Sequence, residues 1–322
     1  MAPVNRRFGL GLLSGLLLLS GCGTASPTPV ATPTPTPSRP GPAMVQIENS
    51  PLARPLSGLQ QANLVFEYLA EGGITRLTVI YFQPSGTLRI EPVRSARPVT
   101  LRLQKAYQGV LFFSGANARV LDAIQQQNVP SLTEGSDGGI YFQRDPARRA
   151  PHNLTTNGDR LAQGQAKYAP RVTYRLPAPG QPVASPTPPA ATHLQFDQTS
   201  FHRVIYSYSP GDGAYAYSTV DGPLLDRDTG QAIKPVNVIV LQVAHHDAGF
   251  TDVLGAPAVD FDLQGSGPAD VFSQGHHYAA SWNLANPALP LKFLSADGKA
   301  MHLPEGLTWI HLVDPGTPVS SS

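Results

Sequence analysis

Residues 63–82 read NLVFEYLAEGGITRLTVIYF, and this stretch decides how the chain begins to fold. Asn63 to Leu69 and Arg76 to Phe82 are apolar runs rich in β-branched and aromatic residues, which is typical of buried strands. Between them, Glu71-Gly72-Gly73-Ile74-Thr75 contains two glycines, which allow a tight turn or the close approach of a ligand. We therefore predict two buried strands joined by a short polar connection.

Outward from this pair, the first part of the chain alternates strands and helices. Gly109 to Phe113 has the pattern of a third buried strand. Pro98 to Tyr107 and Asn117 to Gln127 are predicted helices, and Pro98 suits the first position of a helix. This alternation indicates an N-terminal α/β domain, a mixed α+β sandwich, over residues 44–176.

The second part of the chain is predicted to be a smaller, mostly β domain over residues 192–315, with a tail at 316–322. A proline-rich segment at 177–191 separates the two parts and reads as a linker or an insertion. Gly265-Ser266-Gly267 is expected to be a turn. Six segments of this second part are predicted to be strands: His202 to Tyr208, Ala214 to Thr219, Val236 to Val243, Val259 to Leu263, Tyr278 to Trp282 and Thr308 to Val313.

The first 43 residues predict export and a lipid anchor. Arg6 and Arg7 precede the apolar run Leu10 to Leu19, which is too short to span a bilayer. Leu19-Ser20-Gly21-Cys22 is similar to a bacterial lipobox, so residues 1–22 are predicted to be a lipoprotein signal peptide, with Cys22 as the lipidated N-terminus. The alternative is an ordinary signal peptide that happens to hold a cysteine. Residues 23–43 are Thr/Pro-rich, which favours an extended spacer. The predicted location is the extracytoplasmic face of the cell membrane.

Composition narrows the possible chemistry. Cys22 is the only cysteine, so a disulfide, a thiolate metal site and a nucleophilic cysteine are not expected in the folded part. Residues 44–176 hold 15 Lys and Arg against 9 Asp and Glu, and 13 of the 15 are arginine. Residues 192–322 hold 5 against 13. The two halves could attract one another, or the basic half could bind an anion. Few lysines and no basic run argue against nucleic acid.

The segment Arg94 to Pro98 is the strongest candidate site. A helix that begins at Pro98 offers free N–H groups and a partial positive charge, which favour an anion. Arg94, Ser95 and Arg97 would complete a carboxylate or phosphate pocket. In the alternative, Ser95 caps the helix and the arginines pair with Glu91 and Glu48. Other polar groups at strand ends are assigned to the same ligand-binding site: Glu48, Asn49, Glu71, Arg76, Ser114, Asn117, His152 and Asn153.

His152 could be a general base or a ligand, but the sequence favours a buried histidine bonded to the backbone. We expect Glu71 to form a structural ion pair with Arg76 or Arg94. His245-His246 and His276-His277 lie on predicted strands, where neighbouring side chains point to opposite faces, so we predict surface pairs and no metal site. The sequence contains no nucleophile, phosphate-loop or dinucleotide motif, and no cofactor is expected.

In this order, the segments resemble the YerB-like lipoproteins. The resemblance is carried by Glu48 to Pro51, Glu67 to Arg76, Pro92 to Pro98 and Ala150 to Leu154. It continues in the second half with Asn237 to Val240, Gly265 to Gly267, Gly275 with Trp282, and Gly306 to Ile310. The resemblance implies an N-terminal α/β unit of sandwich type and a smaller β-rich unit behind a lipoprotein signal. The family is one of unknown function, so it implies no reaction.

Three functional hypotheses follow. The first is an envelope lipoprotein that binds an anionic glycan, peptide or phosphate-bearing ligand in the arginine-lined cleft. The second is an envelope-polymer hydrolase or transferase with Glu71 or Glu67 and His152 as acid and base. The third is a scaffolding lipoprotein that docks another envelope protein. The lack of a nucleophile motif favours a binding protein over an enzyme.

Overall fold

The computed structural model describes residues 39–169, 173–174, 188–252 and 254–322. The predicted signal peptide, Cys22 and most of the predicted spacer and linker lie outside these residues. The described residues are mostly strand, with 22 strands, three α-helices and four short 3₁₀ helices. The predicted α/β class therefore fits only loosely, because the fold is dominated by sheet.

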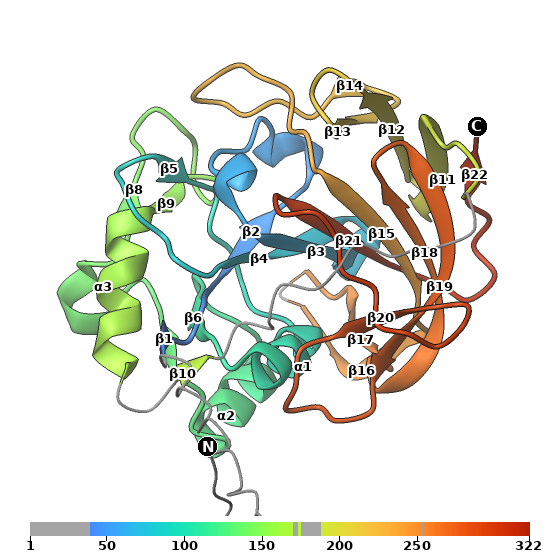
Figure 1. The fold of residues 1–322 in the computed structure, drawn as a ribbon. Helices are drawn as coiled ribbons and strands as arrows, with labels where there is room; N and C mark the ends of the chain where they lie inside the picture. Colours follow the sequence, from blue (N-terminus) through green and yellow to red (C-terminus); the bar gives the residue numbers. More distant parts are fainter. Residues whose placement is uncertain (1–38, 170–172, 175–187, 253) are drawn as a thin grey trace, which may run out of the picture. The chain divides into compact units, whose positions relative to one another are not determined.

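A ten-stranded sheet forms the centre of the fold (Figure 1). The strands that carry the long apolar runs lie in its interior, as expected for strands buried on both faces. In spatial order the sheet contains β20 (Lys292–Ser295), β19 (His276–Leu284), β18 (Gly265–Ser273), β15 (Asn237–Gln242), β21 (Thr308–Val313), β3 (Leu64–Leu69), β4 (Thr75–Tyr81), β2 (Ala43–Glu48), β6 (Val110–Phe112) and β7 (Ser131–Leu132).

Strand β21 joins the two halves of the sequence. It pairs in parallel with β3, so that Thr308 lies opposite Leu64, and in parallel with β15, so that Thr308 also lies opposite Asn237. The segments predicted as separate domains therefore share one sheet. Periodicity predicts the strands but not this sharing, because the pattern within one segment says nothing about its neighbour in space.

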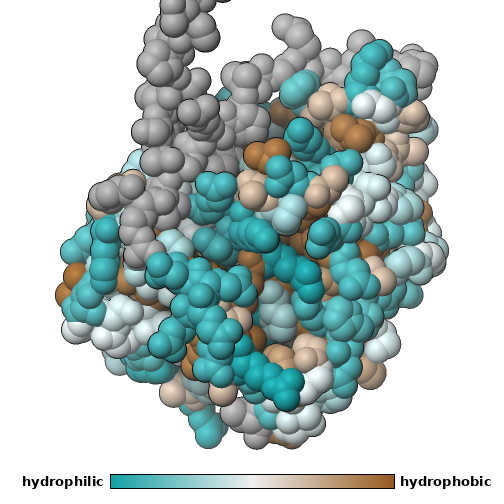
Figure 2. Space-filling model, turned by 90° about the horizontal axis from the view of Figure 1, so that it is seen from below, coloured by the Kyte–Doolittle hydropathy of each residue, from teal (hydrophilic) through white to brown (hydrophobic). Residues whose placement is uncertain are grey.

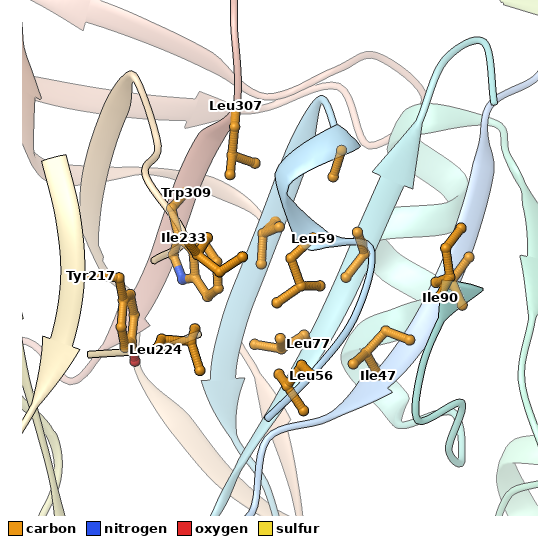
Figure 3. Packing of buried hydrophobic residues seen from close by; sticks show 14 of the residues in the cluster. Ile47, Leu56, Leu59, Leu77, Ile90, Tyr217, Leu224, Ile233, Leu307 and Trp309 are labelled. Atoms are coloured by element: carbon orange, nitrogen blue, oxygen red, sulfur yellow. The ribbon is translucent and has the colours of Figure 1, made fainter. Parts of the chain in front are cut away.

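A second sheet and a helix cover one face of the central sheet. Trp309 and Tyr217 pack there with Leu59 and Leu77, so the second half closes over the first (Figure 3). The covering elements are the five-stranded sheet β14 (Gly222–Pro223), β13 (Ala214–Thr219), β12 (His202–Ser209), β11 (His193–Thr199) and β22 (Ser320–Ser321), and the helix α3 (Gly158–Tyr168).

Two helices and a hairpin cover the other face. Helix α1 (Pro98–Tyr107) and helix α2 (Ala118–Gln126) bury their apolar stripes there. The hairpin β16 (His245–Thr251) and β17 (Pro257–Phe261) lies beside α1. Short elements complete the fold: β1 (Arg39–Pro40), β10 (Thr173–Tyr174), β5 (Arg89–Ile90), β9 (Leu154–Asn157), β8 (Gln143–Arg144), and the 3₁₀ helices η1 (Pro51–Ala53), η2 (Leu59–Gln61), η3 (Glu71–Gly73) and η4 (Ser136–Gly139).

The predicted helices and strands are present, and their ends lie within two residues of the predicted ones. Helix α1 has the predicted bounds, and α2 begins one residue after Asn117, which caps it. Helix α3, β2, β11, β16 and β20 were not predicted. The folded part begins before the expected residue 44, because β1 is paired and residues 41–43 are buried. At the other end, β22 lies in the predicted tail and pairs with β11.

The prediction of a turn at Gly265 to Gly267 is wrong, because these residues begin β18. The physical reason lies across the strand pair. Gly267 lies opposite Trp282 on β19, and a Cβ atom at Gly267 would stand 2.7 Å from the indole Nε1. The glycine therefore allows the indole to lie against the strand backbone.

Candidate ligand-binding site

The N-terminus of α1 is held at the end of β2 by backbone hydrogen bonds. The N–H of Arg94 donates to the carbonyl of Gln46 at 2.8 Å, and the N–H of Ser114 donates to the carbonyl of Arg94 at 3.0 Å. Pro98 is the first helical residue and Arg97 is the N-cap. Pro98 has no N–H group and the Thr100 N–H donates to the Arg97 carbonyl at 3.0 Å, so the partial positive charge at this position comes mainly from the helix dipole. The strand-to-helix junction predicted from the sequence is therefore present.

Arg76 approaches the same point from the start of β4, directly across from Glu48 on β2. It is only 2% exposed, yet its Nε and Nη1 have no hydrogen-bond partner among the described residues. Burial, together with repulsion by Arg97 and Arg94, lowers the pKa of Arg76 to about 9. The side chain is thus still charged at neutral pH, although its charge is desolvated and lacks a direct partner.

Glu48 pairs with two groups at this site. Its Oε2 lies 3.3 Å from Nε of Arg94 and 2.8 Å from Nδ1 of His152, while its Oε1 accepts a hydrogen bond from Ser50 at 2.8 Å. Burial by itself would raise the pKa of Glu48, but Arg94, His152 and Ser50 together hold it below its ordinary value. An ionised carboxylate accepts from Nδ1, which leaves Nε2 of His152 available to a ligand.

Glu71 pairs with Arg97 and not with the predicted Arg76 or Arg94. Its Oε2 lies 2.7 Å from Nε and 2.5 Å from Nη2 of Arg97. The pairing follows from η3, which places Glu71 beside the start of α1. The prediction of a structural ion pair at Glu71 is therefore right in kind and wrong in partner.

The cluster carries an excess of positive charge. We call Arg76, Arg94 and Arg97 the arginine cluster, and they face two carboxylates, those of Glu48 and Glu71. One positive charge is therefore left uncompensated at the positive end of a helix. The side chains of Arg94 and Arg97 are 23% and 14% exposed, so the cluster is accessible from solvent.

Six of the eleven residues predicted for ligand binding come together here: Glu48, Glu71, Arg76, Arg94, Arg97 and His152. Ser114 belongs to the junction through its backbone, and Ser95 does not cap α1, because the N-cap residue is Arg97. The remaining three are turned elsewhere. Asn49 bonds to Glu67, Asn117 caps α2, and Asn153 bonds to Arg144.

A second polar centre, built around Glu67, was not predicted. Glu67 is fully buried on β3 and accepts hydrogen bonds from both halves of the chain. Burial alone would raise the pKa of Glu67, but His202, His311 and Thr75 lower it to about 2. The donors are Asn49 Nδ2 at 2.9 Å, Thr75 Oγ1 at 2.9 Å, Trp309 Nε1 at 2.9 Å, His202 Nε2 at 3.1 Å and Tyr217 Oη at 3.3 Å.

His311, beside Glu67, is held neutral. The Nε2 of Gln198 donates to the Leu312 carbonyl, so its Oε1 is the acceptor that faces Nδ1 of His311 at 2.8 Å. Nδ1 therefore carries the proton, and Nε2 accepts from the Tyr206 hydroxyl at 2.9 Å. Burial lowers the pKa of His311 to about 4, although Glu67 opposes this shift. Glu67, His311 and their partners are buried, apart from His202, whose side chain is 15% exposed, and this burial favours a structural role for the Glu67 centre.

In the first histidine pair predicted to lie on the surface, the two rings contact separate carboxylates, whereas in the second pair, among the residues that the structure describes, only His277 contacts one, Asp270 at 2.7 Å. His245 lies 2.5 Å from Asp314 and His246 lies 3.3 Å from Asp262, on opposite faces of β16. Within the described ranges, no group of three or more His, Cys, Asp or Glu side chains is arranged to hold a metal ion. In the same residues, no helix is long and apolar enough to cross a membrane.

Two family models match this chain. Residues 28–171 match the N-terminal domain and residues 192–310 match the C-terminal domain of a protein of unknown function, DUF3048. The chain belongs to this family. YerB of Bacillus subtilis (strain 168), whose name proposes a lipoprotein, is 27% identical over 281 residues, which cover 84% of this chain and 81% of that protein. The crystal structure of YerB from Bacillus subtilis matches with a TM-score of 0.71 at 25% identity, over 88% of this chain and 94% of that one.

Proposed function

We propose that this protein is a membrane-anchored lipoprotein of the bacterial cell envelope that binds an anionic ligand at the N-terminus of α1. The uncompensated charge of Arg76 carries the proposal. A buried guanidinium without a partner costs free energy, and proteins retain such groups where a ligand supplies the partner. The helix terminus and the two neighbouring arginines favour negative charge at the same point.

Replacing Arg76 by Met tests this site. Met fills most of the same volume and leaves two arginines facing two carboxylates, so the charge is balanced. We expect the saturable chemical-shift changes that acetate and inorganic phosphate cause in the wild-type protein to disappear. We also expect the free energy of unfolding to rise by about 1 kcal/mol or more, because an unpaired buried charge is removed. Urea unfolding and NMR titration measure the two effects.

The matched control is Arg203→Met, which removes a guanidinium from the surface ion pair with Asp197. Exposed pairs contribute about 0–1 kcal/mol, so this variant should bind the anions as the wild type does and unfold at nearly the same urea concentration. A fall in stability for Arg76→Met without any change in anion binding would mean that Arg76 is purely structural, and the anion site would be withdrawn.

The anchor is proposed at Cys22. The lipobox pattern and the lipoprotein name of the Bacillus relative support it. Replacement of Cys22 by Ala should abolish fatty-acid labelling and release the protein from the membrane fraction, because stable anchoring requires more than one acyl chain at that residue. The urea midpoint of the folded part should not change. Fatty-acid label that persists on the Cys22→Ala protein would refute lipidation at this position.

A second candidate function, an envelope-polymer hydrolase or transferase, is favoured by one observation. The Glu48–His152 pair at 2.8 Å has the arrangement of a carboxylate that orients a general base. The pairing differs from the predicted Glu71 and His152, since Glu71 is engaged by Arg97. Among the described residues, no hydroxyl group is hydrogen-bonded to the His152 ring, so a nucleophile of the usual triad type is missing there. Ligand binding therefore remains the better-supported function.

A further inference from the structure

We infer that a groove between α1 and α2 holds the rest of the ligand, and that this ligand is a short acidic peptide whose C-terminal carboxylate lies in the arginine cluster. The inference rests on the proposed function, because it takes the anion at the start of α1 as given. It adds the chemical class of the ligand and a second surface that contacts it.

The groove has a volume of about 350 Å³, within the range of small-ligand sites, which is about 300–1,000 Å³. One wall is a single face of α1, because its lining residues follow the helical spacing i, i+3, i+4 and i+7. These residues are Pro98, Leu101, Arg102 and Lys105; the other walls are Arg119, Val120, Ala123 and Gln127 of α2, with Phe250 and Asp260 of the hairpin. Hydrophilic side chains with apolar patches between them cover the face of the molecule on which these helices lie (Figure 2).

The groove begins where the arginine cluster ends. Pro98 lines the groove and directly follows Arg97, whose side chain belongs to the cluster. Strand β17 contacts both α1 and η3, so the cluster and the groove also share a wall. Lys105 lies seven residues further along α1, about 10 Å at 1.5 Å per residue. An extended peptide covers that distance in about three residues, at about 3.3 Å each.

The charges in the groove favour an acidic ligand. Asp260 neutralises Arg102, with 2.6 Å between Oδ2 and Nη2 and 3.1 Å between Oδ1 and Nε, and this pair fixes the hairpin against α1. Lys105 and Arg119 are exposed and have no carboxylate partner in the described part of the chain. The Arg119 guanidinium lies 5.8 Å from the centre of the Phe250 ring, which holds it over the groove.

The apolar walls favour a peptide over a polyol-phosphate chain. Leu101, Val120 and Phe250 offer surface that can bury an aliphatic side chain, and a repeating polyol phosphate has none to bury. The arginine cluster has one uncompensated positive charge, which a carboxylate with a single charge balances. A terminal phosphate monoester, with a charge of about −1.5 to −2 at neutral pH, would exceed it, whereas an internal phosphodiester is disfavoured by the apolar walls alone.

The probe is a pool of tetrapeptides that carry an uncharged dye on the N-terminus. The first residue is Glu, and the other three positions hold aliphatic residues. We expect fluorescence anisotropy to show saturable binding of the free carboxylate pool, at least tenfold weaker binding of the C-terminal amide pool, and at least tenfold weaker binding to the double variant Lys105→Glu, Arg119→Glu. Acetate binding, followed by NMR, should not change in this variant. Lys292→Glu, on strand β20, is the matched control and should bind both probes as the wild type does.

Each other result has a distinct meaning. A pool that binds no better than acetate, or equally well to the double variant, overturns the inference and leaves the anion site intact. An oligomeric glycerol phosphate that binds more tightly than the peptides and is weakened by the double variant would overturn the peptide class. If acetate titrates neither the wild type nor Arg76→Met, the proposed function itself fails.

Discussion

Replacing Glu67 by Gln is expected to lower the free energy of unfolding by about 3–5 kcal/mol, the largest single effect in this molecule. The carboxylate accepts hydrogen bonds from several buried donors, Trp309 and Tyr217 among them. Gln keeps one acceptor oxygen and turns an NH₂ group toward donors that then have no acceptor. Each unsatisfied buried donor costs about 1–3 kcal/mol. Urea unfolding followed by tryptophan fluorescence measures the loss, because Trp309 is itself a donor to Glu67.

Glu134→Gln is the matched control for this change. Glu134 also loses its charge, but its ion pair with Arg144 is exposed, with 40% and 46% of the two side chains accessible. Its replacement should cost less than about 1 kcal/mol. Similar losses for Glu67→Gln and Glu134→Gln would show that the buried centre is no more than an ordinary surface interaction in energy.

The second large effect is a loss of stability between pH 6.5 and pH 4. In the unfolded chain His311 has its ordinary pKa of 6.5, whereas burial lowers the pKa in the folded protein to about 4. The unfolded state therefore binds a proton that the folded state does not, and folding is penalised as the pH falls through this window. At about 1.4 kcal/mol per pKa unit, the loss approaches about 3 kcal/mol.

Glu67 extends the acid sensitivity to lower pH. Its pKa is about 2 in the folded protein against 4.5 ordinarily, so the stability it contributes is complete above pH 4.5 and is lost as the pH falls toward 2. Besides burial, two charged groups shift the pKa of His311: Glu67 raises it and His202 lowers it. The two windows meet near pH 4 to 4.5, and stability should decline without a plateau.

Urea unfolding of the wild type and of His311→Gln at pH 6.5, 5.5 and 5.0 isolates the histidine, since most carboxylates titrate lower. The variant should be less stable than the wild type at pH 6.5 and should lose less stability on going to pH 5.0. Parallel pH profiles for the two proteins would exclude His311 as the titrating group.

Local patterns predicted the elements whose residues act within their own segment. Residues 63–82 form β3, η3 and β4 because each strand carries a continuous apolar run, and Pro98 and Asn117 mark the starts of α1 and α2 because their preferences are local. Helix α3 was not predicted, because it contains Gly164 and glycine disfavours helices. A Cβ atom there would stand 2.5 Å from the ring of Phe112, so the glycine is required by packing that the sequence does not display.

For the candidate site, the sequence predicted which residue types gather at the start of α1 but only part of the ion pairs that they form. The helix start and its arginines follow from sequence, because they are adjacent in the chain. The choice of Arg97 as the partner of Glu71 does not, because it depends on where η3 places the carboxylate. The burial of Arg76 could not be predicted from the sequence either, since a charged residue at a strand end is usually exposed. In the Glu67 centre, Glu67 and its donor Trp309 are 242 positions apart, and no local pattern can reveal such a contact.

The position of β21 between β3 and β15 sets a constraint on biosynthesis. A nascent chain that ends before residue 308 lacks β21, the strand at the junction of the two halves, so β3 presents an unpaired edge and Glu67 lacks Trp309. An open edge of this kind invites pairing with other chains. Folding to completion must therefore wait until almost the whole polypeptide has been made, and long-range pairing of this sort forms slowly. For the exported lipoprotein proposed above, late completion of the sheet would keep the polypeptide in a state that can be threaded across a membrane.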